Sequence, residues 1–233
     1  MAIVVPTYNE SETLPQLIEK VVAEDIVGLG FIVVDDGSPD GTGVIADGLA
    51  DEFAGVFIVL HREGKQGLGT AYVAGFQTAL DTGAQCIVEM DADLSHPPEV
   101  LPGLIAELEE ADVAVASRYT PGGGVDPGWS WARKQISYWG NVGIRLILGL
   151  KVKDATAGFK AFRRTTLEHI GLDRLRLSGF GFQAEVAYRC EQVGLKVAEH
   201  PYVFMERTTG KSKMSFGIVV EAFFRLSWLR IRR

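Results

Sequence analysis

The sequence predicts an α/β domain with a mostly parallel β-sheet that is covered by helices on both faces. Short apolar runs alternate with longer segments of helical pattern through the first half of the chain. The runs contain almost no polar residues, which is typical of strands that are buried on both faces of a sheet. Strands and helices that alternate in this way form parallel sheets, because each helix returns the chain to the same edge.

Strands and helices are expected in strict alternation before residue 118. We place the strands at residues 2–5, 31–34, 56–60, 86–88 and 113–116. We place the helices near residues 11–25, 42–53, 70–81 and 99–110. Pro6 ends the first strand, and a segment rich in Asp, Gly and Pro at 35–42 ends the second, as turn-forming residues do.

The pattern becomes less regular after residue 118, starting with a glycine-rich loop at 121–124. A long helix is expected at 129–150, an additional strand at 159–162 and a further helix at 182–193. Residues 197–204 are expected to form a late strand, which could run antiparallel at the edge of the sheet. We divide the chain into a domain at 1–214 and a C-terminal extension at 215–233.

The C-terminal extension has the pattern of an amphipathic helix. Its apolar residues are Phe216, Val219, Val220, Phe223, Phe224, Leu226, Trp228 and Ile231. Arginines and one glutamate interrupt them, so that one face is basic and the other is apolar and aromatic. Such a helix fits a membrane surface, where cations meet anionic headgroups. It fits equally a packing position against the domain or against a second copy of the chain.

The composition limits the partners and the compartment. The chain has 233 residues, 47% hydrophobic and 23% charged, which is enough to bury a substantial core. The formal net charge of −7 argues against nucleic acid as a main partner, because phosphate backbones require a basic face. Cys86 and Cys190 are expected to be buried thiols in a reducing compartment. The first strand begins at Ala2 and no apolar run reaches about 18 residues, so we expect a cytoplasmic protein.

An acidic motif at residues 89–98 (EMDADLSHPP) follows the strand at 86–88. If the extended geometry of the strand continues, Asp91 and Asp93 project to the same side. Two carboxylates held together repel each other unless a cation lies between them, and a hard divalent cation is the natural partner. The alternative is an acidic turn before the next helix, since Pro97 and Pro98 suit a helix start. For an isolated Asp-x-Asp this alternative is the favoured interpretation.

Two other polar clusters follow strands, at residues 6–10 and 35–38, and this coincidence favours a binding site. The carboxyl ends of parallel strands meet at one edge, where the ligands of open sheets bind. Tyr8 could stack on a base, while Glu10 and Asp36 could accept hydrogen bonds from a base or a ribose. Asp93 could hold a metal on a diphosphate. Taken singly, Asp36 and Glu10 could serve only to cap helices.

Several blocks of the sequence resemble family 2 glycosyltransferases of the GT-A fold, which has a Rossmann-like sheet. They are residues 4–10 (VVPTYNE), 34–42 (VDDGSPDGT) and 90–98 (MDADLSHPP). Residues 65–72 (KQGLGTAY), 117–119 (SRY) and 207–213 (RTTGKSK) narrow the resemblance to dolichol- or polyprenol-phosphate mannose synthases. The similarity extends from residue 2 to about residue 215.

The resemblance implies transfer of mannose from GDP-mannose to a polyprenyl or dolichyl monophosphate, with inversion, at the cytoplasmic face of a membrane. By position, the nucleoside of the donor would contact Pro6, Tyr8, Glu10, Val34 and Asp36, and Asn9 and Lys65 are further candidates for substrate binding. Asp91, Ala92 and Asp93 would lie along the diphosphate and the sugar, and Asp93 would bind Mg²⁺ or Mn²⁺. Ser95 stands where some relatives have Gln, so its hydroxyl would bind the metal directly or through a water.

The resemblance also implies a cationic cradle for the lipid phosphate. Its candidates are Arg118, Arg133 with Ser137, Arg207 and Lys213. The guanidinium fork suits bidentate binding of phosphate, and the loop at 207–213 could close over both phosphates. The expected catalytic residues are Asp91, Asp93 and Arg118. A lipid acceptor also favours the membrane interpretation of the C-terminal helix.

A phosphate acceptor is already an anion, with a second pKa of about 6, so a dedicated general base is less necessary than for a hydroxyl. Asp154, Lys160 and Glu185 are weaker candidates for the site, and a helix-capping or scaffold role is as consistent with the position of Glu185. His96, which lies beside two prolines, is expected to be structural, since hard cations prefer oxygen ligands.

Three competing functions remain. The first is a transferase of the same fold that uses another sugar, such as glucose, or a UDP donor. The second is a noncatalytic nucleotide-sugar-binding protein, which the Asp91 and Asp93 pair and the basic residues argue against. The third is a dehydrogenase, but no G-x-G-x-x-G fingerprint follows the first strand and no Walker-type phosphate loop occurs.

Overall fold

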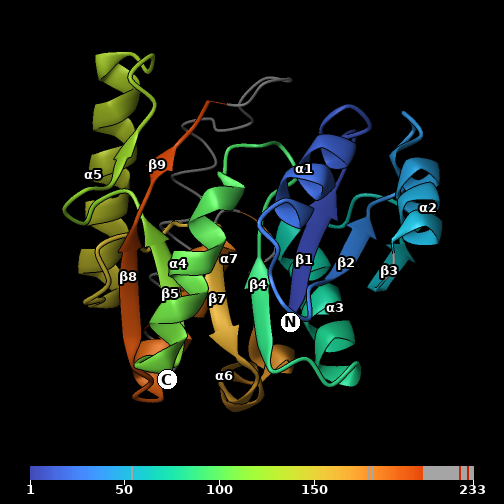
Figure 1. Ribbon diagram of the computed structural model, residues 1–233. Coiled ribbons are helices and arrows are strands. Elements are labelled where there is room, and N and C mark those ends of the chain that lie inside the picture. Colours follow the sequence, from blue (N-terminus) through green and yellow to red (C-terminus); the bar gives the residue numbers. More distant parts are fainter. Residues whose placement is uncertain (54, 178, 180, 207–225, 227–229, 231–233) are drawn as a thin grey trace.

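The computed structural model describes residues 1–53, 55–177, 179, 181–206, 226 and 230, which contain one large and one small β-sheet. The large sheet has seven strands in the order β3-β2-β1-β4-β7-β5-β8 (Figure 1). These strands are β1 (Ala2–Thr7), β2 (Gly30–Asp35), β3 (Val56–His61), β4 (Cys86–Glu89), β5 (Val113–Ser117), β7 (Lys160–Arg163) and β8 (Val197–Pro201). The small sheet pairs β6 (Gly124–Val125) with β9 (Val203–Phe204).

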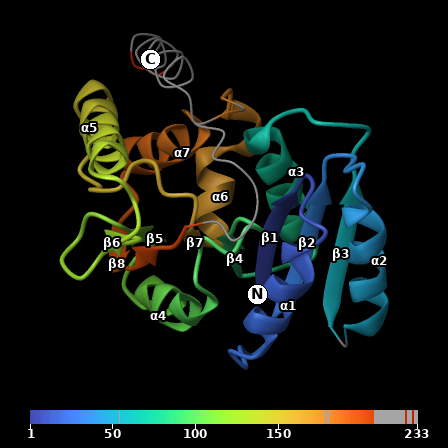
Figure 2. The same ribbon diagram turned by 90° about the horizontal axis from the view of Figure 1, so that it is seen from above.

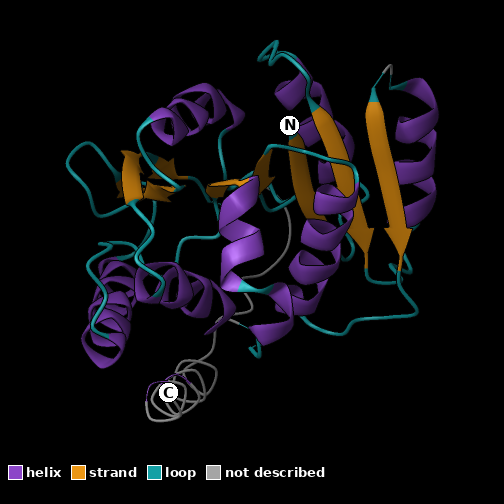
Figure 3. Cartoon of the chain, turned by 90° about the horizontal axis from the view of Figure 1, so that it is seen from below, coloured by secondary structure: helices purple, strands orange, loops and turns teal. Residues whose placement is uncertain are grey.

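Helices lie on both faces of the large sheet, as Figures 2 and 3 show. One face carries α1 (Thr13–Val22), α2 (Thr42–Glu52) and α4 (Leu101–Ala106), with short 3-10 segments at Pro98–Val100 and Glu107–Glu109 on either side of α4. The other face carries α3 (Leu68–Asp81), α5 (Trp131–Leu148), α6 (Arg164–Ile170), a 3-10 segment at Leu172–Arg174, and α7 (Gly181–Gln192). The expected α/β architecture is therefore confirmed.

The strands divide their side chains between two apolar cores, one on each face. In β1, Ile3 and Val5 pack with α1, whereas Val4 packs on the opposite face with α3. This division follows from the alternation of side chains along a strand. Each aliphatic side chain that leaves water contributes about 1.5–3 kcal/mol of transfer free energy. A strand covered on both faces must therefore be apolar at almost every position, as the sequence pattern indicated.

The directions of the two late strands, β7 and β8, come from the structure. β7 runs antiparallel to both of its neighbours, and Lys160 lies opposite Glu89 of β4. β8 runs parallel to β5, so the expected antiparallel strand at 197–204 is wrong, and this segment is also divided between β8 and β9. The physical reason is where the chain enters the sheet. The chain enters β7 at the edge where the parallel strands end, so β7 runs back against its neighbours. The N–H of Asp112 donates to Lys196 O, so β8 begins beside the start of β5 and runs in the same direction.

α5 has a clear signal at each end. The hydroxyl of Ser130 accepts the backbone N–H of Arg133 at 3.3 Å, as an N-cap residue does. Gly149 follows the last turn with a φ of 71°, a conformation that costs glycine little and other residues more. The expected helix at 129–150 is therefore confirmed.

The expected C-terminal helix at 215–233 lies outside the described residues except at two positions. Leu226 is buried in the core on the side of α5, and Arg230 donates from Nη1 to the carbonyls of Leu146 and Ile147. No helix formed by the described residues combines the length and the apolar character needed to cross a bilayer.

Candidate active site

A pocket of about 300 Å³ lies at the edge of the sheet where β1, β2 and β4 end. It is lined by Pro6, Thr7, Tyr8, Glu10, Asp36, Lys65, Gly67, Leu68, Ala71, Asp91, Ala92, Asp93 and Gly179. The three polar clusters expected from the sequence therefore contribute to one pocket. Their convergence follows from the parallel register, which places Thr7 beside Asp35 and Val4 beside Glu89.

Tyr8 and Lys65 both line the pocket and contact each other. The Lys65 ammonium lies 4.6 Å from the centre of the Tyr8 ring, a cation–π contact. Glu10 accepts the Thr13 hydroxyl at 2.8 Å, which holds its carboxylate at the first turn of α1. Asn9 does not line the pocket; it is exposed, has a φ of 62°, and donates its N–H to the Ser38 hydroxyl at 3.0 Å.

Asp36 is paired with a residue that the sequence did not indicate. Its carboxylate lies 3.0 Å from Nη1 of Arg62, and both side chains are nearly buried. Burial raises the pKa of Asp36, and the positive charge of Arg62 only partly opposes that effect. Val34 lies two residues before Asp36. Its side chain packs in the core beneath α3 and so faces away from the pocket.

The acidic motif forms a turn directly after β4. The chain bends at Ala92 and Asp93, and Leu94 has a φ of 62°, so the extended geometry on which the expectation depended does not continue. Both carboxylates still line the pocket. Asp93 Oδ1 accepts the backbone N–H of Ser95 at 3.0 Å and the Ser95 hydroxyl at 2.5 Å, which fixes the turn.

Asp91 is held by two buried side chains. The Tyr72 hydroxyl donates to Asp91 Oδ1 at 2.8 Å, and the Asp91 backbone N–H donates to Nδ1 of His96 at 3.1 Å. The His96 ring stacks on Phe159 at 5.1 Å, and burial lowers its pKa despite the nearby carboxylates. His96 is therefore a neutral imidazole that accepts through Nδ1, which agrees with the expected structural role.

A buried ion pair lies beneath the acidic turn. Lys160 of β7 donates to Glu89 Oε1 at 2.7 Å, to the Gln183 side chain at 2.5 Å and to the Ala157 carbonyl at 2.5 Å. Burial raises the pKa of Glu89, and Lys160 opposes this shift. Glu185, another weaker candidate, accepts two backbone N–H groups at residues 176 and 177, so its contacts are those of a scaffold residue.

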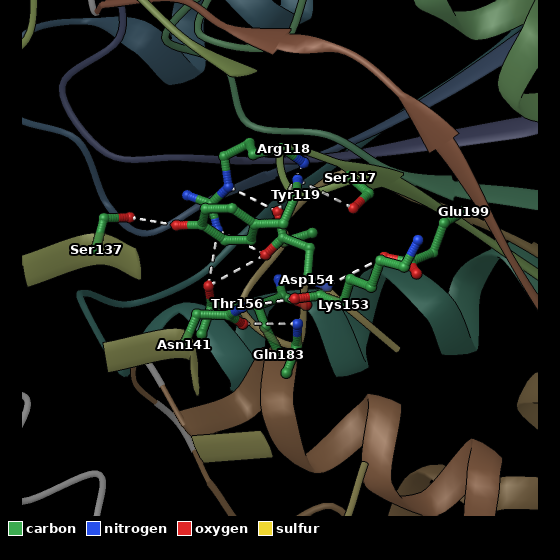
Figure 4. A network of polar contacts seen from close by, with 12 residues as sticks. Ser117, Arg118, Tyr119, Ser137, Asn141, Lys153, Asp154, Thr156, Gln183 and Glu199 are labelled. Carbon is green, nitrogen blue, oxygen red and sulfur yellow. Dashed lines mark hydrogen bonds and ion pairs between the residues drawn. The ribbon is translucent and has the colours of Figure 1, made fainter. Parts of the chain in front are cut away.

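Arg118 does not line the pocket and has a buried partner of its own (Figure 4). Its Nε and Nη2 donate to the two carboxylate oxygens of Asp154 at 2.7 Å each, and Nη2 also donates to Thr156. Next to it, the Tyr119 and Ser137 hydroxyls are 2.8 Å apart. The structure therefore connects the end of β5 to the first half of α5 through this network.

Arg133 lies on the same helix at a partly exposed position. Its guanidinium is 3.8 Å from the centre of the Trp129 ring, and Nη1 donates to Glu206 at 2.5 Å. Arg207 and Lys213, the remaining members of the expected cradle, lie outside the described residues.

Residues 2–171 match the family model described as glycosyl transferase family 2. The chain belongs to this family. It is 46% identical over 219 residues to an undecaprenyl-phosphate mannosyltransferase of Micrococcus luteus, covering 94% of this chain and 89% of that protein. It is 43% identical over 231 residues to a polyprenol monophosphomannose synthase of Mycolicibacterium smegmatis, covering 99% of this chain and 86% of that protein.

The fold of this family 2 glycosyltransferase is also found in a solved structure. Glucosyl-3-phosphoglycerate synthase from Mycobacterium tuberculosis, in complex with Mn²⁺, uridine-diphosphate-glucose and phosphoglyceric acid, matches with a TM-score of 0.69. The identity is 19%, and the match covers 98% of this chain and 78% of that chain. The likeness confirms the expected GT-A-like arrangement.

The oxygen atoms at the acidic turn suit a hard divalent cation. Asp93 offers a carboxylate, and the Ser95 hydroxyl keeps its lone pairs while it donates its hydrogen to Asp93. Among the described residues, no group of three or more His, Cys, Asp or Glu side chains could form a protein-only metal site. Mg²⁺ commonly takes one or two protein oxygens and completes its shell with substrate phosphates and water. The donor set of this glycosyltransferase fits that pattern.

Sequence reasoning missed two of the polar residues that hold the site. Tyr72 lies in the block at 65–72, and Arg62 precedes it, but neither position carries a local pattern. A general expectation existed for both residues, because a buried carboxylate needs a hydrogen-bond donor or a cation beside it. This expectation does not identify the partner in the sequence, since Tyr72 and Asp91 lie on different elements.

Proposed function

We propose that this glycosyltransferase moves mannose from GDP-mannose to a polyprenyl monophosphate, with inversion at the anomeric carbon. The observation that carries the proposal is the pocket that Asp91 and Asp93 line together with Tyr8 and Lys65. Two relatives, at 46% and 43% identity over nearly the whole chain, are named for mannose transfer to polyprenyl phosphates. A match of this extent supports the same substrate class here.

The donor would lie along the pocket with its base near Tyr8 and its sugar near the acidic turn. Asp36 and Glu10 are acceptors suited to the N–H groups of a base or the hydroxyls of a ribose. Lys65, already fixed above Tyr8, brings a positive charge toward the diphosphate. Pro6 and Ala92 supply apolar wall, and the N–H of Asn9 connects the end of β1 to Ser38 after β2.

Asp93 and Ser95 would hold Mg²⁺ or Mn²⁺ at the diphosphate. The bound ion would neutralise the negative charge that develops as the nucleoside diphosphate departs. Asp91 would accept hydrogen bonds from hydroxyl groups of the sugar. The chain's own contribution is a rigid turn, because Ser95, Tyr72 and His96 fix the two aspartates before any ligand arrives.

The acceptor would be a lipid phosphate that attacks the anomeric carbon on the face opposite the leaving group. A phosphate monoester is largely dianionic at neutral pH, so no side chain has to remove a proton from it. Arg133 with Ser137, together with Arg207 and Lys213, would attract and orient the phosphate. A catalytic role for Arg118 would use its Nη1 edge, because Nε and Nη2 bind Asp154 and Thr156.

A lipid acceptor requires the enzyme to work at a membrane surface, which we propose is the cytoplasmic one, and α5 supports a location at a membrane surface. Trp131, Ile136, Tyr138, Trp139 and Leu146 of this helix are large apolar side chains that are exposed. An α-helix turns by about 100° per residue, so these five side chains lie on one side of the helix. Arg133 and Lys134 lie on the same helix, and a basic helix with exposed aromatic residues suits an anionic membrane surface.

The proposal is tested by transfer assays with radiolabelled donors. GDP-mannose, GDP-glucose and UDP-glucose are each supplied with a polyprenyl monophosphate, with Mg²⁺ or Mn²⁺ and with EDTA. We expect label in the lipid fraction with GDP-mannose and metal, and none with EDTA. Preferential transfer from GDP-glucose or UDP-glucose would overturn the mannose assignment, and label in no lipid fraction would overturn the acceptor class.

A further inference from the structure

A buried tyrosine from α3 holds the first aspartate of the acidic turn. The Tyr72 hydroxyl lies 2.8 Å from Asp91 Oδ1, across 19 residues of sequence. Burial raises the pKa of Tyr72 well above its ordinary value, and the negative charges of Asp91 and Glu89 raise it further. The hydroxyl therefore keeps its proton at neutral pH and acts as a donor to the carboxylate.

The Tyr72 ring cannot move easily. It is stacked between Phe76, with ring centres 5.7 Å apart, and Phe182, with ring centres 5.9 Å apart. Helix α3, which carries Tyr72, also packs closely against its neighbours at two glycines. A Cβ on Gly75 would lie 2.2 Å from a Val4 methyl carbon, and one on Gly69 would lie 2.4 Å from the Leu177 carbonyl oxygen. The hydroxyl is thus a fixed point relative to the sheet.

Asp91 needs such a point. It lies two residues from Asp93 and two from Glu89, and these negative charges disfavour its own. His96 fixes the Asp91 backbone through Nδ1. The hydrogen bond to Oδ1 restricts the rotation of the carboxylate itself.

We propose that Tyr72 is a positioning residue: it holds the Asp91 carboxylate in the orientation that receives the nucleotide-sugar donor. The inference rests on the proposed function, because it takes the pocket to be the donor site. Tyr72 acts through Asp91 and is not itself at the pocket wall. Loss of this contact removes one constraint on the orientation of the carboxylate, and donor binding then has to supply it.

The test compares Tyr72→Phe with Tyr188→Phe. Tyr188 is also buried, on α7, and its hydroxyl has no hydrogen-bond partner among the described residues, so it controls for the loss of a phenolic oxygen. We expect Tyr72→Phe to lower kcat/KM for transfer by roughly tenfold to hundredfold, the range for a hydrogen bond to a charged group. Tyr188→Phe should retain wild-type kcat/KM, and both variants should remain folded.

A double-mutant cycle separates positioning from general support. The affinity for GDP-mannose with Mn²⁺ is measured by calorimetry for Tyr72→Phe in the wild-type background and in the Asp91→Ala background. We expect a loss of roughly tenfold in the first background and none in the second, because the hydroxyl then has no carboxylate to hold. An equal loss in both backgrounds, or a loss no greater than that of Tyr188→Phe, would overturn the inference.

Failure of the proposed function gives a different result. If the wild-type protein binds GDP-mannose but transfers nothing to lipid, the acceptor assignment fails while the calorimetric cycle still decides the role of Tyr72. If the wild-type protein binds UDP-glucose in place of GDP-mannose, the donor assignment fails and the same cycle is run with UDP-glucose.

Discussion

Arg118 and Asp154 form a buried bidentate ion pair between positions 36 residues apart, with both side-chain hydrogen bonds 2.7 Å long. Asp154 Oδ2 also accepts the backbone N–H of Arg118 at 3.0 Å. The aspartate side chain is fully buried, and that of the arginine is 10% exposed. The pair therefore joins the end of β5 to the loop between α5 and β7, next to the proposed site of the lipid phosphate.

Asp154→Ala is expected to destabilise the protein strongly. Removing one member of a buried pair leaves the other charge without compensation, which costs about 3–5 kcal/mol. Urea unfolding followed by circular dichroism measures the change. Glu168→Ala is the matched control, because Glu168 pairs with Arg164 at an exposed i,i+4 position and should contribute less than about 1 kcal/mol. Equal effects of the two substitutions would contradict the assignment of the Arg118 pair as structural.

The same pair predicts a pH dependence. Burial by itself would raise the pKa of Asp154, but the positive charge and hydrogen bonds of Arg118 outweigh it and hold that pKa below the ordinary value. A carboxylate with a lowered folded pKa stabilises the protein above the unfolded pKa of about 3.9, and that stability is lost as the pH falls through the folded pKa. The difference in unfolding free energy between wild type and Asp154→Asn should therefore shrink below about pH 4. A difference that stays constant from pH 7 to pH 3 would contradict this prediction.

Asp93→Ala is expected to abolish nearly all transfer without unfolding the protein. The loss should be at least about 100-fold, since electrostatic stabilisation at a developing charge is commonly of that size. Transfer of radiolabelled mannose and thermal unfolding are measured together. Asp81→Ala removes an exposed carboxylate at the opposite end of α3 from the pocket and should leave transfer unchanged. Full activity of Asp93→Ala would remove the metal-site assignment.

Trp139→Ala is expected to weaken binding to vesicles that contain anionic lipid. Burial of a large apolar side chain contributes about 1.5–3 kcal/mol, so its removal should lower the partition coefficient roughly tenfold or more. Trp139 is 62% exposed, and thermal stability should change little. Val27→Ala is the control, because Val27 is 94% exposed but lies before β2 and outside α5. Unchanged vesicle binding by Trp139→Ala would exclude α5 as a membrane surface.

The sequence predicted most elements of the fold because their signals are local. The apolar runs that became β1 to β5 lie within one or two residues of the expected positions, and α5 begins and ends within two residues of its expected bounds. The carboxyl-edge location of Tyr8, Asp36 and Asp93 also followed from local order, since parallel strands end together. α6 was missed, because a helix of seven residues gives too short a periodic pattern to recognise.

The direction of β7 could not be read from its residues. An apolar strand has the same composition whether it runs up or down, and the direction depends on which edge of the sheet the preceding loop reaches. The same limit applied to β8, which was expected to be antiparallel and is parallel.

The sequence alone thus determined the class of fold, the position of the acidic motif directly after a strand, and the family, because each is written in contiguous residues. Only the tertiary structure decided the partners of the charged groups: Arg62 for Asp36, Tyr72 for Asp91 and Asp154 for Arg118. These partners are brought together by the packing of separate elements. A buried charge requires a partner on physical grounds, but which residue supplies it depends on distances that the linear order does not contain.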